Sequence, residues 1–318
     1  MPVGLPFQPM ITFSSPADMR AWADQQRAAG KTIGFVPTMG ALHSGHVALI
    51  ADAVRCADLV VVSIFVNPLQ FNEPTDFDGY PRPVDDDVAL CSAAGVSVVF
   101  APTATAMYPP GFQTRIVPGA LADVMEGPHR PGHFEGVVTV VAKLLGAVRP
   151  HIAIFGQKDY QQLRIITQMA ADFEFGVTII GHPIVRDADG VAQSSRNLRL
   201  SADQRSAAIA VPHSLDAAVR AASHTNNVDA IVGAALAVVA EEPLATHEYI
   251  SIFDAITLEE IDNLTPAHRS PGVTRIATAV WFGDIRLIDN RELFPATTAT
   301  LRSDLGVPDL NATPCPPS

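Results

Sequence analysis

Residues 34–46 read Gly-Phe-Val-Pro-Thr-Met-Gly-Ala-Leu-His-Ser-Gly-His, between apolar Ile33 and the mostly apolar run 47–54. This order predicts a buried strand, a glycine-bearing turn and then a helix. A helix start offers free backbone N–H groups and the positive end of the helix dipole, which suits an anion such as a phosphate. By itself, a His-x-Gly-His motif is also compatible with a tight turn that carries two surface histidines.

The two histidines of this motif, His43 and His46, lie three residues apart. At helical spacing both side chains would project from the same face of the first turn. Gly40 and Gly45 carry no Cβ, so we expect them to let a ligand approach the main chain closely. The stretch therefore predicts a nucleotide site.

Composition indicates a two-domain protein with a substantial core. The chain has 318 residues, of which 48% are hydrophobic and 17% charged, and domains typically contain about 100–200 residues. The net charge of −12 argues against a nucleic-acid binder, which should carry a basic face. We therefore expect local cations, rather than the field of the whole protein, to attract any anionic substrate.

The cysteines Cys56, Cys91 and Cys315 form no Cys-x-x-Cys pair. This argues against a cysteine zinc site and fits a reducing cytoplasm. The sequence has no signal-peptide pattern, and no stretch reaches the roughly 18 uninterrupted apolar residues of a membrane span. We expect a cytoplasmic protein that does not bind membranes.

Residues 1–184 alternate strand and helix patterns. Strands are predicted at 33–36, 59–66, 97–100, 152–155 and 177–180, and helices at 16–29, after the His-x-Gly-His turn, and at 84–94, 136–148 and 159–173. The alternation predicts an α/β fold: a Rossmann-like open parallel sheet with helices on both faces. Ligands of such sheets bind beyond the carboxyl ends of the strands. Residues 101–131 lack periodicity and are predicted to be a lid or partner surface.

The pattern changes after residue 184. Helices are predicted at 202–222 and 228–240, and strands at 248–254, 273–281 and 285–289. We therefore expect a smaller α+β domain that acts as a lid at residues 185–294. Residues 1–9 are expected to be loose, and residues 295–318 are predicted to form a flexible tail.

Polar side chains follow two of the predicted strands. Asn67 and Gln70 are amides that suit the hydroxyl and carboxylate groups of a small substrate, although such amides are more often turn residues. Lys158 could neutralise phosphate oxygens, and Asp159 could accept hydrogen bonds from ribose hydroxyls. Gln162 lies one turn further and could return to the same pocket. The alternative for Asp159 is a helix N-cap beside a surface lysine.

A further group, Ser194-Ser195-Arg196, lies at the predicted domain junction. Two hydroxyls and a guanidinium there could clamp a triphosphate, although Ser-Ser could equally be a linker or a cap.

Two weaker groups remain. Asp86 and Asp87 could hold Mg²⁺ or merely stabilise a helix start. Arg130 and His133 belong either to a turn or to a basic mouth of the site.

Four motifs in this order resemble those of the pantothenate synthetase (pantoate–β-alanine ligase) family, within the cytidylyltransferase-like nucleotidyl-transfer superfamily. They are residues 37–46, Phe-Val-Asn-Pro-Leu-Gln-Phe at 65–71, Gly-Gln-Lys-Asp-Tyr-Gln-Gln at 156–162 and Ser-Ser-Arg-Asn at 194–197. The resemblance implies that pantoate attacks the α-phosphorus of Mg-ATP to give pantoyl adenylate and pyrophosphate. β-Alanine then displaces AMP to give pantothenate. Another nucleotidylyltransferase of this fold and a non-catalytic ATP sensor are the alternatives.

The resemblance also implies residue roles and an assembly. Catalysis would fall to His46, in the proton donor's place, with His43, Lys158 and Arg196. ATP would be bound by Pro37, Thr38, Met39, His43, Gly45, His46, Gly156, Lys158, Asp159, Val185, Gln193, Ser194, Ser195 and Arg196. Pantoate and β-alanine would be bound by Gln70, Gln162, Asn67, Arg130 and His133. Mg²⁺ would accompany ATP, and the family is usually a homodimer.

The chain departs from the family pattern at two positions. Gln193 stands where methionine is usual, and Arg199 stands where an aromatic residue is common. If the methionine acts through its backbone, activity should survive the change; otherwise we expect a different affinity for ATP.

Overall fold

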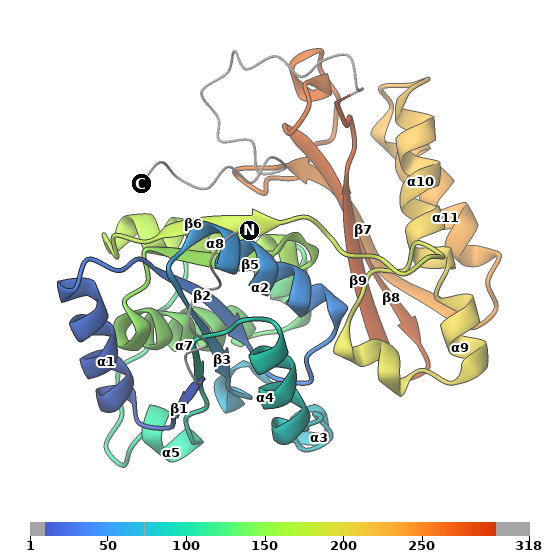
Figure 1. The fold of residues 1–318 in the computed structure, drawn as a ribbon. Helices are drawn as coiled ribbons and strands as arrows, with labels where there is room; N and C mark the ends of the chain where they lie inside the picture. Colours follow the sequence, from blue (N-terminus) through green and yellow to red (C-terminus); the bar gives the residue numbers. More distant parts are fainter. Residues whose placement is uncertain (1–9, 73, 297–318) are drawn as a thin grey trace, which may run out of the picture.

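The computed structural model describes residues 10–72 and 74–296, and its larger body is built on a six-stranded parallel sheet (Figure 1). The strands are β1 Ile11–Phe13, β2 Ile33–Thr38, β3 Leu59–Ile64, β4 Val98–Phe100, β5 Ile152–Gly156 and β6 Thr178–His182. Their order is β1-β4-β3-β2-β5-β6, so the direction of winding reverses between β2 and β5. Open α/β sheets bind ligands at this kind of switch point. The predicted Rossmann-like parallel sheet is confirmed.

Helices cover both faces of this sheet. One face carries α1 Pro16–Ala28, α7 His133–Val148 and α8 Tyr160–Asp172, and the other carries α2 Ser44–Cys56 and α4 Val84–Ala93. Phe35 packs in the first layer and its neighbour Val36 in the second, because successive side chains of a strand point to opposite faces. Both layers are apolar, as expected for a sheet that is buried on both sides.

Two sequence expectations for this body need correction. The short edge strand β1, which pairs with β4, was not predicted. The long segment expected to lack structure contains α5 Ala104–Met107 and α6 Glu126–His129, besides a 3-10 turn at Ala120–Ala122. A further short helix, α3 Pro74–Asp78, precedes α4. The lid or partner role of this segment stays a prediction, and residues 1–9 lie outside the described part of the chain.

The smaller body is a three-stranded antiparallel sheet covered by helices on one side (Figure 1). Its elements are α9 Ala202–Ala207, α10 Ala210–Ala222, α11 Val228–Ala240, β7 Ala245–Asp254, β8 Thr274–Phe282 and β9 Ile285–Glu292. The prediction of one helix over 202–222 is wrong. Pro212 has no N–H to continue a helix from α9, and it lies instead in the first turn of α10, where proline is tolerated. Most of the predicted tail, residues 297–318, lies outside the described residues.

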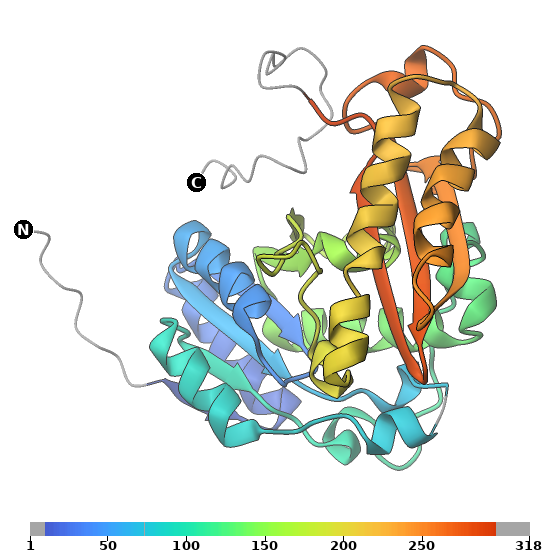
Figure 2. The same ribbon diagram turned by 90° about the vertical axis from the view of Figure 1, so that its right-hand side faces the viewer.

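The two bodies are joined by the segment that follows β6, drawn in yellow in Figure 2. The small sheet also meets the larger body directly, because Tyr160 at the start of α8 packs against Phe253 of β7. Among the described residues, none of the helices is both long and apolar enough to cross a membrane.

Candidate active site

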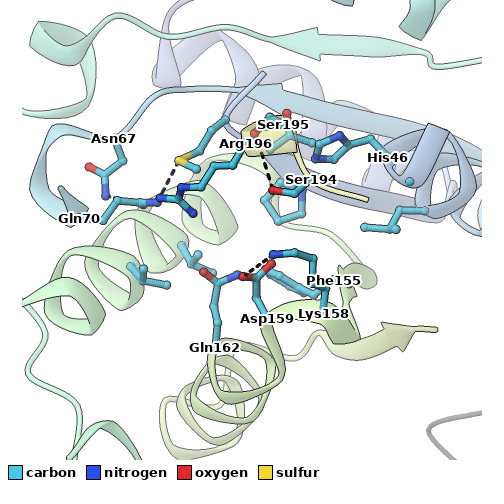
Figure 3. A pocket seen from close by; sticks show the side chains of 18 of the residues that line it. His46, Asn67, Gln70, Phe155, Lys158, Asp159, Gln162, Ser194, Ser195 and Arg196 are labelled. Atoms are coloured by element: carbon cyan, nitrogen blue, oxygen red, sulfur yellow. Dashed lines mark hydrogen bonds and ion pairs between the residues drawn. The ribbon is translucent and has the colours of Figure 1, made fainter. Parts of the chain in front are cut away.

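A cavity of about 230 Å³ opens where β2, β3, β5 and β6 end, beside the segment that leads to the small domain. Figure 3 shows Lys158, Asp159 and Gln162 across the cavity from Gln70 and Arg196. Every residue predicted to bind ATP, pantoate or β-alanine lines it: Pro37, Thr38, Met39, His43, Gly45, His46, Asn67, Gln70, Arg130, His133, Gly156, Lys158, Asp159, Gln162, Val185, Gln193, Ser194, Ser195 and Arg196. Their roles toward substrates stay predictions.

The backbone of the turn between β2 and α2 is held by the side chain of Asp87 of α4. Its two carboxylate oxygens accept the backbone N–H groups of Ala41 at 2.8 Å and Leu42 at 2.7 Å. Thr38 adds a buried hydrogen bond, since its hydroxyl donates to the carbonyl of Ser63 at 2.7 Å. This turn therefore has one well-determined conformation.

The magnesium assignment for Asp86 and Asp87 stays a prediction that these contacts do not support. Asp87 is buried with both oxygens occupied by backbone donors, whereas Asp86 is exposed on α4. Neither residue lines the cavity. Within the described residues, no group of three or more His, Cys, Asp or Glu side chains is arranged to hold a metal. The acidic residues serve the helix start and the neighbouring turn.

Gly40 and Gly45 were expected to let a ligand approach the main chain, but side chains of the protein itself also require a glycine at both positions. A Cβ at Gly40, whose φ is 82°, would lie 2.9 Å from the Asp87 carboxylate. A Cβ at Gly45 would lie 2.8 Å from the His43 ring. Both glycines thus leave room for side chains of the protein itself, although Gly45 also borders the cavity.

His43 and His46 cap the start of α2 and hold each other. The ring nitrogen Nδ1 of His43 accepts the N–H of Gly45 at 3.1 Å, and Nδ1 of His46 accepts the N–H of His43 at 3.3 Å. The ring centroids are 4.1 Å apart. Because Nδ1 is an acceptor in both rings, a neutral imidazole must carry its proton on Nε2. Each histidine therefore has an Nε2–H group left to donate.

Both rings are kept neutral by their surroundings. Burial, followed by the neighbouring His43, lowers the pKa of His46 to about 3. Burial and the charge of Lys158 lower the pKa of His43 as well. At neutral pH the start of α2 thus has uncharged hydrogen-bond donors.

Asn67, which follows β3, is held by hydrogen bonds within the protein. Its side chain is 1% exposed. Its amide donates to Gln70 Oε1 at 3.0 Å and to the carbonyl of Gly136 at 3.1 Å, and its oxygen accepts from the hydroxyl of Tyr108 at 2.7 Å. Since both amide protons are used within the protein, Asn67 orients Gln70 rather than offering donors of its own.

Gln70 is also held from its main chain. His133 Nδ1 lies 2.8 Å from the carbonyl of Gln70, and His133 Nε2 lies 3.0 Å from Nη1 of Arg130. Burial and the charge of Arg130 lower the pKa of His133 to about 4. The neutral ring therefore donates from Nδ1 and accepts from Arg130 at Nε2. Both ring nitrogens are occupied, so His133, like Asn67, supports Gln70.

Lys158 and Asp159 lie across the cavity from Gln70, in a 3-10 turn at Gln157–Asp159 between β5 and α8. Lys158 Nζ lies 3.6 Å from Asp159 Oδ1. Desolvation would raise the pKa of Asp159, but Lys158 and Arg196 outweigh it, and the pKa lies below its usual value. Of the described residues that line the cavity, three are cationic (Arg130, Lys158 and Arg196) and one is a carboxylate, Asp159. The cavity thus contains the local cations expected in an acidic protein, and their attraction of an anionic substrate stays a prediction.

An apolar wall and one tyrosine were missed in the sequence. Val137, Val141 and Leu144 of α7 line the cavity, yet their helical spacing indicates only a core-facing stripe. The hydroxyl of Tyr80 lies 3.2 Å from Ser195 Oγ, and burial raises the pKa of Tyr80. The cavity is thus lined by both polar and apolar side chains.

The family model described as Pantoate-beta-alanine ligase matches residues 11–292. The chain belongs to the pantoate–β-alanine ligase family. It is 47% identical over 294 residues to "Pantothenate synthetase" of Mycobacterium avium (strain 104), covering 91% of this chain and 92% of that protein. It is 44% identical over 282 residues to the Chlorobaculum tepidum protein of the same name, covering 88% and 98%.

Solved structures of this family have the same fold. Pantothenate synthetase from Thermus thermophilus matches with a TM-score of 0.83 at 41% identity, covering 90% of this chain and 100% of that chain. Pantoate-beta-alanine ligase from Francisella tularensis, complexed with beta-gamma ATP and beta-alanine, matches with a TM-score of 0.72 at 33% identity, covering 90% and 98%. The resemblance drawn from the four motifs is confirmed, and the protein is a ligase that forms a C–N bond.

The two departures from the family pattern both make polar contacts. Gln193 accepts a hydrogen bond from Ser44 at 2.5 Å and donates to Asp187 at 3.0 Å. Arg199 pairs with Asp76 at 2.9 Å, and Arg196 pairs with the same carboxylate at 3.2 Å. Gln193 therefore ties the start of α2 to the segment after β6, and Asp76 binds both arginines of the next turn.

Proposed function

We propose that this ligase condenses (R)-pantoate with β-alanine at the expense of ATP, through a pantoyl-adenylate intermediate, and releases AMP and pyrophosphate. One observation carries the proposal. A single cavity is lined by uncharged histidine donors, cations, oriented amides and an apolar stripe of α7. Pantothenate made in this way is a precursor for coenzyme A biosynthesis.

At the nucleotide end, the chain's groups would act by position and charge. Lys158 and Arg196 would neutralise phosphate oxygens, and the Nε2–H groups of His43 and His46 would donate to them. Adenylation needs mainly alignment and stabilisation of developing negative charge. With a pKa of about 3, His46 would act as a hydrogen-bond donor rather than transfer a proton.

At the acid end, Gln70 and Gln162 would bind pantoate. Pantoate has a carboxylate, hydroxyls and a carbon that bears methyl groups. The amides suit its oxygens, and the apolar wall of α7 suits its methyl groups. Asn67 and His133 support this assignment because they hold Gln70 at both its side chain and its main chain.

Mg²⁺ would enter with ATP, bound to the phosphates, and would supply further charge neutralisation at phosphorus. Among the described cavity residues, Asp159 has the carboxylate, and its lowered pKa keeps it ionised. Asp159 is therefore the residue that would contact the ion, beside its expected contact with the ribose.

Three wider assignments belong to the same proposal. The resemblance to the family supports a homodimer, and a cytoplasmic location stays an expectation from the sequence. Division near residue 184 is supported by the end of the parallel sheet at His182 and the beginning of the small-domain helices at Ala202.

Pyrophosphate exchange into ATP tests the function. We expect exchange that requires pantoate and proceeds without β-alanine, and AMP release once β-alanine is added. Exchange that is independent of pantoate would reject the substrate, as expected of another nucleotidylyltransferase. Absence of any exchange or AMP release would favour the sensor alternative.

Single substitutions test the residue roles. His46→Ala and Lys158→Ala should each lower the exchange rate at least about tenfold, which corresponds to about 1.4 kcal/mol of barrier. Turnover near the wild-type rate would remove the substituted residue from the catalytic set.

A further inference from the structure

Asn290, in β9 of the small domain, contacts the turn that carries Lys158. The side chain is 2% exposed. Its amide nitrogen donates to the main-chain carbonyls of Gln157 and Lys158, each at 2.9 Å. An amide has two N–H groups, so both are used on two consecutive carbonyls of this turn.

The orientation of this amide is fixed by its other partner. Asn290 Oδ1 accepts from Arg275 Nη2 at 2.7 Å and from Nε at 3.3 Å. The guanidinium of Arg275 lies 4.2 Å from the ring centroid of Tyr160, directly after the turn. Reversing the amide would set its NH₂ against a cation and its oxygen against two carbonyl oxygens. The side chain can therefore meet all these partners in one orientation.

The preceding residue of β9 holds another segment that borders the cavity. Asp289 accepts from Arg186 at 2.6 and 3.0 Å, and Arg186 follows the cavity residue Val185. Asp289 also accepts the backbone N–H of Asn290 at 2.7 Å. Asp289 and Asn290 of β9, both buried, thus contact two segments that line the cavity.

We infer that Asn290 is a positioning residue for Lys158 in the reaction proposed above. Lys158 has a flexible side chain, and where its ammonium lies depends on where its main chain is held. Asn290 holds that main chain at two carbonyls, and it contacts the turn from the small domain rather than from the neighbouring strands. Small displacements of a charged group away from the developing charge cost rate.

The competing account is that Asn290 only holds the two domains together. In that case its loss would lower stability and would change the rate by the same factor whether or not Lys158 is present. Effects of residues that act through one another are not additive, so a double-mutant cycle separates the two accounts.

The experiment measures pantoate-dependent pyrophosphate exchange for the wild type, Asn290→Ala, Lys158→Ala and the double variant, with thermal unfolding recorded for each. We expect Asn290→Ala to lower kcat at least about fivefold with a smaller change in the KM for pantoate. Added to Lys158→Ala, the same change should lower kcat by less than about twofold. The inference would be overturned if Asn290→Ala lowered kcat by the same factor with and without Lys158, or if it did not lower the kcat of the wild type.

A matched control comes from the same domain. Asn227 caps α11, where its Oδ1 accepts the N–H of Ala230 at 2.9 Å, and it does not line the cavity. Asn227→Ala should lower the unfolding temperature and leave exchange unchanged. If Asn290→Ala does not fold, Asn290→Ser retains a single donor and enters the same cycle with the same criteria. Wild-type exchange without pantoate would reject the proposed function whatever Asn290 does.

Discussion

The cavity has two borders that are held in different ways. The turn between β2 and α2 is held by the buried carboxylate of Asp87, which bonds two backbone N–H groups. In the segment after β6, Arg186 is held by the buried Asp289. The residues beyond it are held by partly exposed pairs, in which Arg205 contacts Asp187 at 2.9 Å and Asp189 at 2.8 Å. Hydrogen bonds to a desolvated charge contribute about 1.5–3 kcal/mol each, whereas exposed ion pairs contribute about 0–1 kcal/mol.

This difference indicates a fixed border and an adjustable one. The fixed border carries His43 and His46, whose ring orientations follow from the backbone of their own turn. The adjustable border carries Ser194, Ser195 and Arg196, next to the connection between the domains. Changes to the first should cost stability and rate together, and changes to the second should alter mainly the affinity for ATP.

The largest effect is expected at Asp87. Asp87→Ala leaves the buried N–H groups of Ala41 and Leu42 without their acceptor, and should lower the free energy of unfolding by about 3 kcal/mol or more. Urea denaturation measures this loss. The exposed neighbour provides the control, since Asp86→Ala should change stability by less than about 0.5 kcal/mol. Restoration of Asp87→Ala activity by added Mg²⁺ would instead revive the metal assignment.

The second-largest effect is expected from acid, which should lower the free energy of unfolding through His46 in the fixed border. The folded pKa of His46, about 3, lies below the unfolded value near 6.5. Between these values the unfolded chain binds the proton and the folded chain does not, so stability falls as the pH drops from 6.5. At pH 5 the loss from His46 should reach about 2 kcal/mol.

The variant His46→Gln keeps an acceptor for the His43 N–H but does not titrate. Its unfolding free energy should therefore fall less steeply between pH 6.5 and pH 5 than that of the wild type. An unchanged slope would show that His46 is not buried as a neutral group.

A smaller effect is expected where the two borders meet. Gln193→Met removes the hydrogen bonds to Ser44 and Asp187 and restores the residue usual in the family. Loss of about 1 kcal/mol should raise the KM for ATP by up to about fivefold, with little change in kcat. Steady-state kinetics of Ser44→Ala and of the double variant complete the test. If the contact matters, the double variant is no worse than either single one.

The smallest effect is expected at Arg205. Arg205→Ala removes partly exposed pairs to Asp187 and Asp189 and should lower stability by less than about 1 kcal/mol. The difference from the wild type should shrink in 1 M salt, where the Debye length is about 3 Å. A loss as large as that of Asp87→Ala would contradict the contrast between the two borders.

The sequence predicted the main features of the fold because these features depend on short-range patterns of apolar and polar residues. Apolar runs marked five of the six strands of the large sheet, and polar residues after them marked the cavity. Strand β1 was not predicted because its three residues form too short a pattern to indicate a strand. The break between α9 and α10 could have been found, since Pro212 signals it.

Long-range pairings could not be predicted in this way. Glu126 of α6 binds Arg286 of β9 at 2.5 and 2.9 Å, across 160 residues of chain, and Asp87 reaches a turn 46 residues away. Short-range sequence patterns do not indicate which distant residues will form such pairs. For the same reason the sequence did not show that Asn67 and His133 make hydrogen bonds to Gln70.

Oxygen transfer tests the central claim most directly. Pantoate labelled with ¹⁸O in both carboxylate oxygens is converted with ATP and β-alanine, and the products are analysed by mass spectrometry. If the carboxylate attacks the α-phosphorus, one labelled oxygen should appear in AMP and the other in pantothenate. AMP without label would contradict the account, because no pantoyl adenylate would then have formed in the cavity.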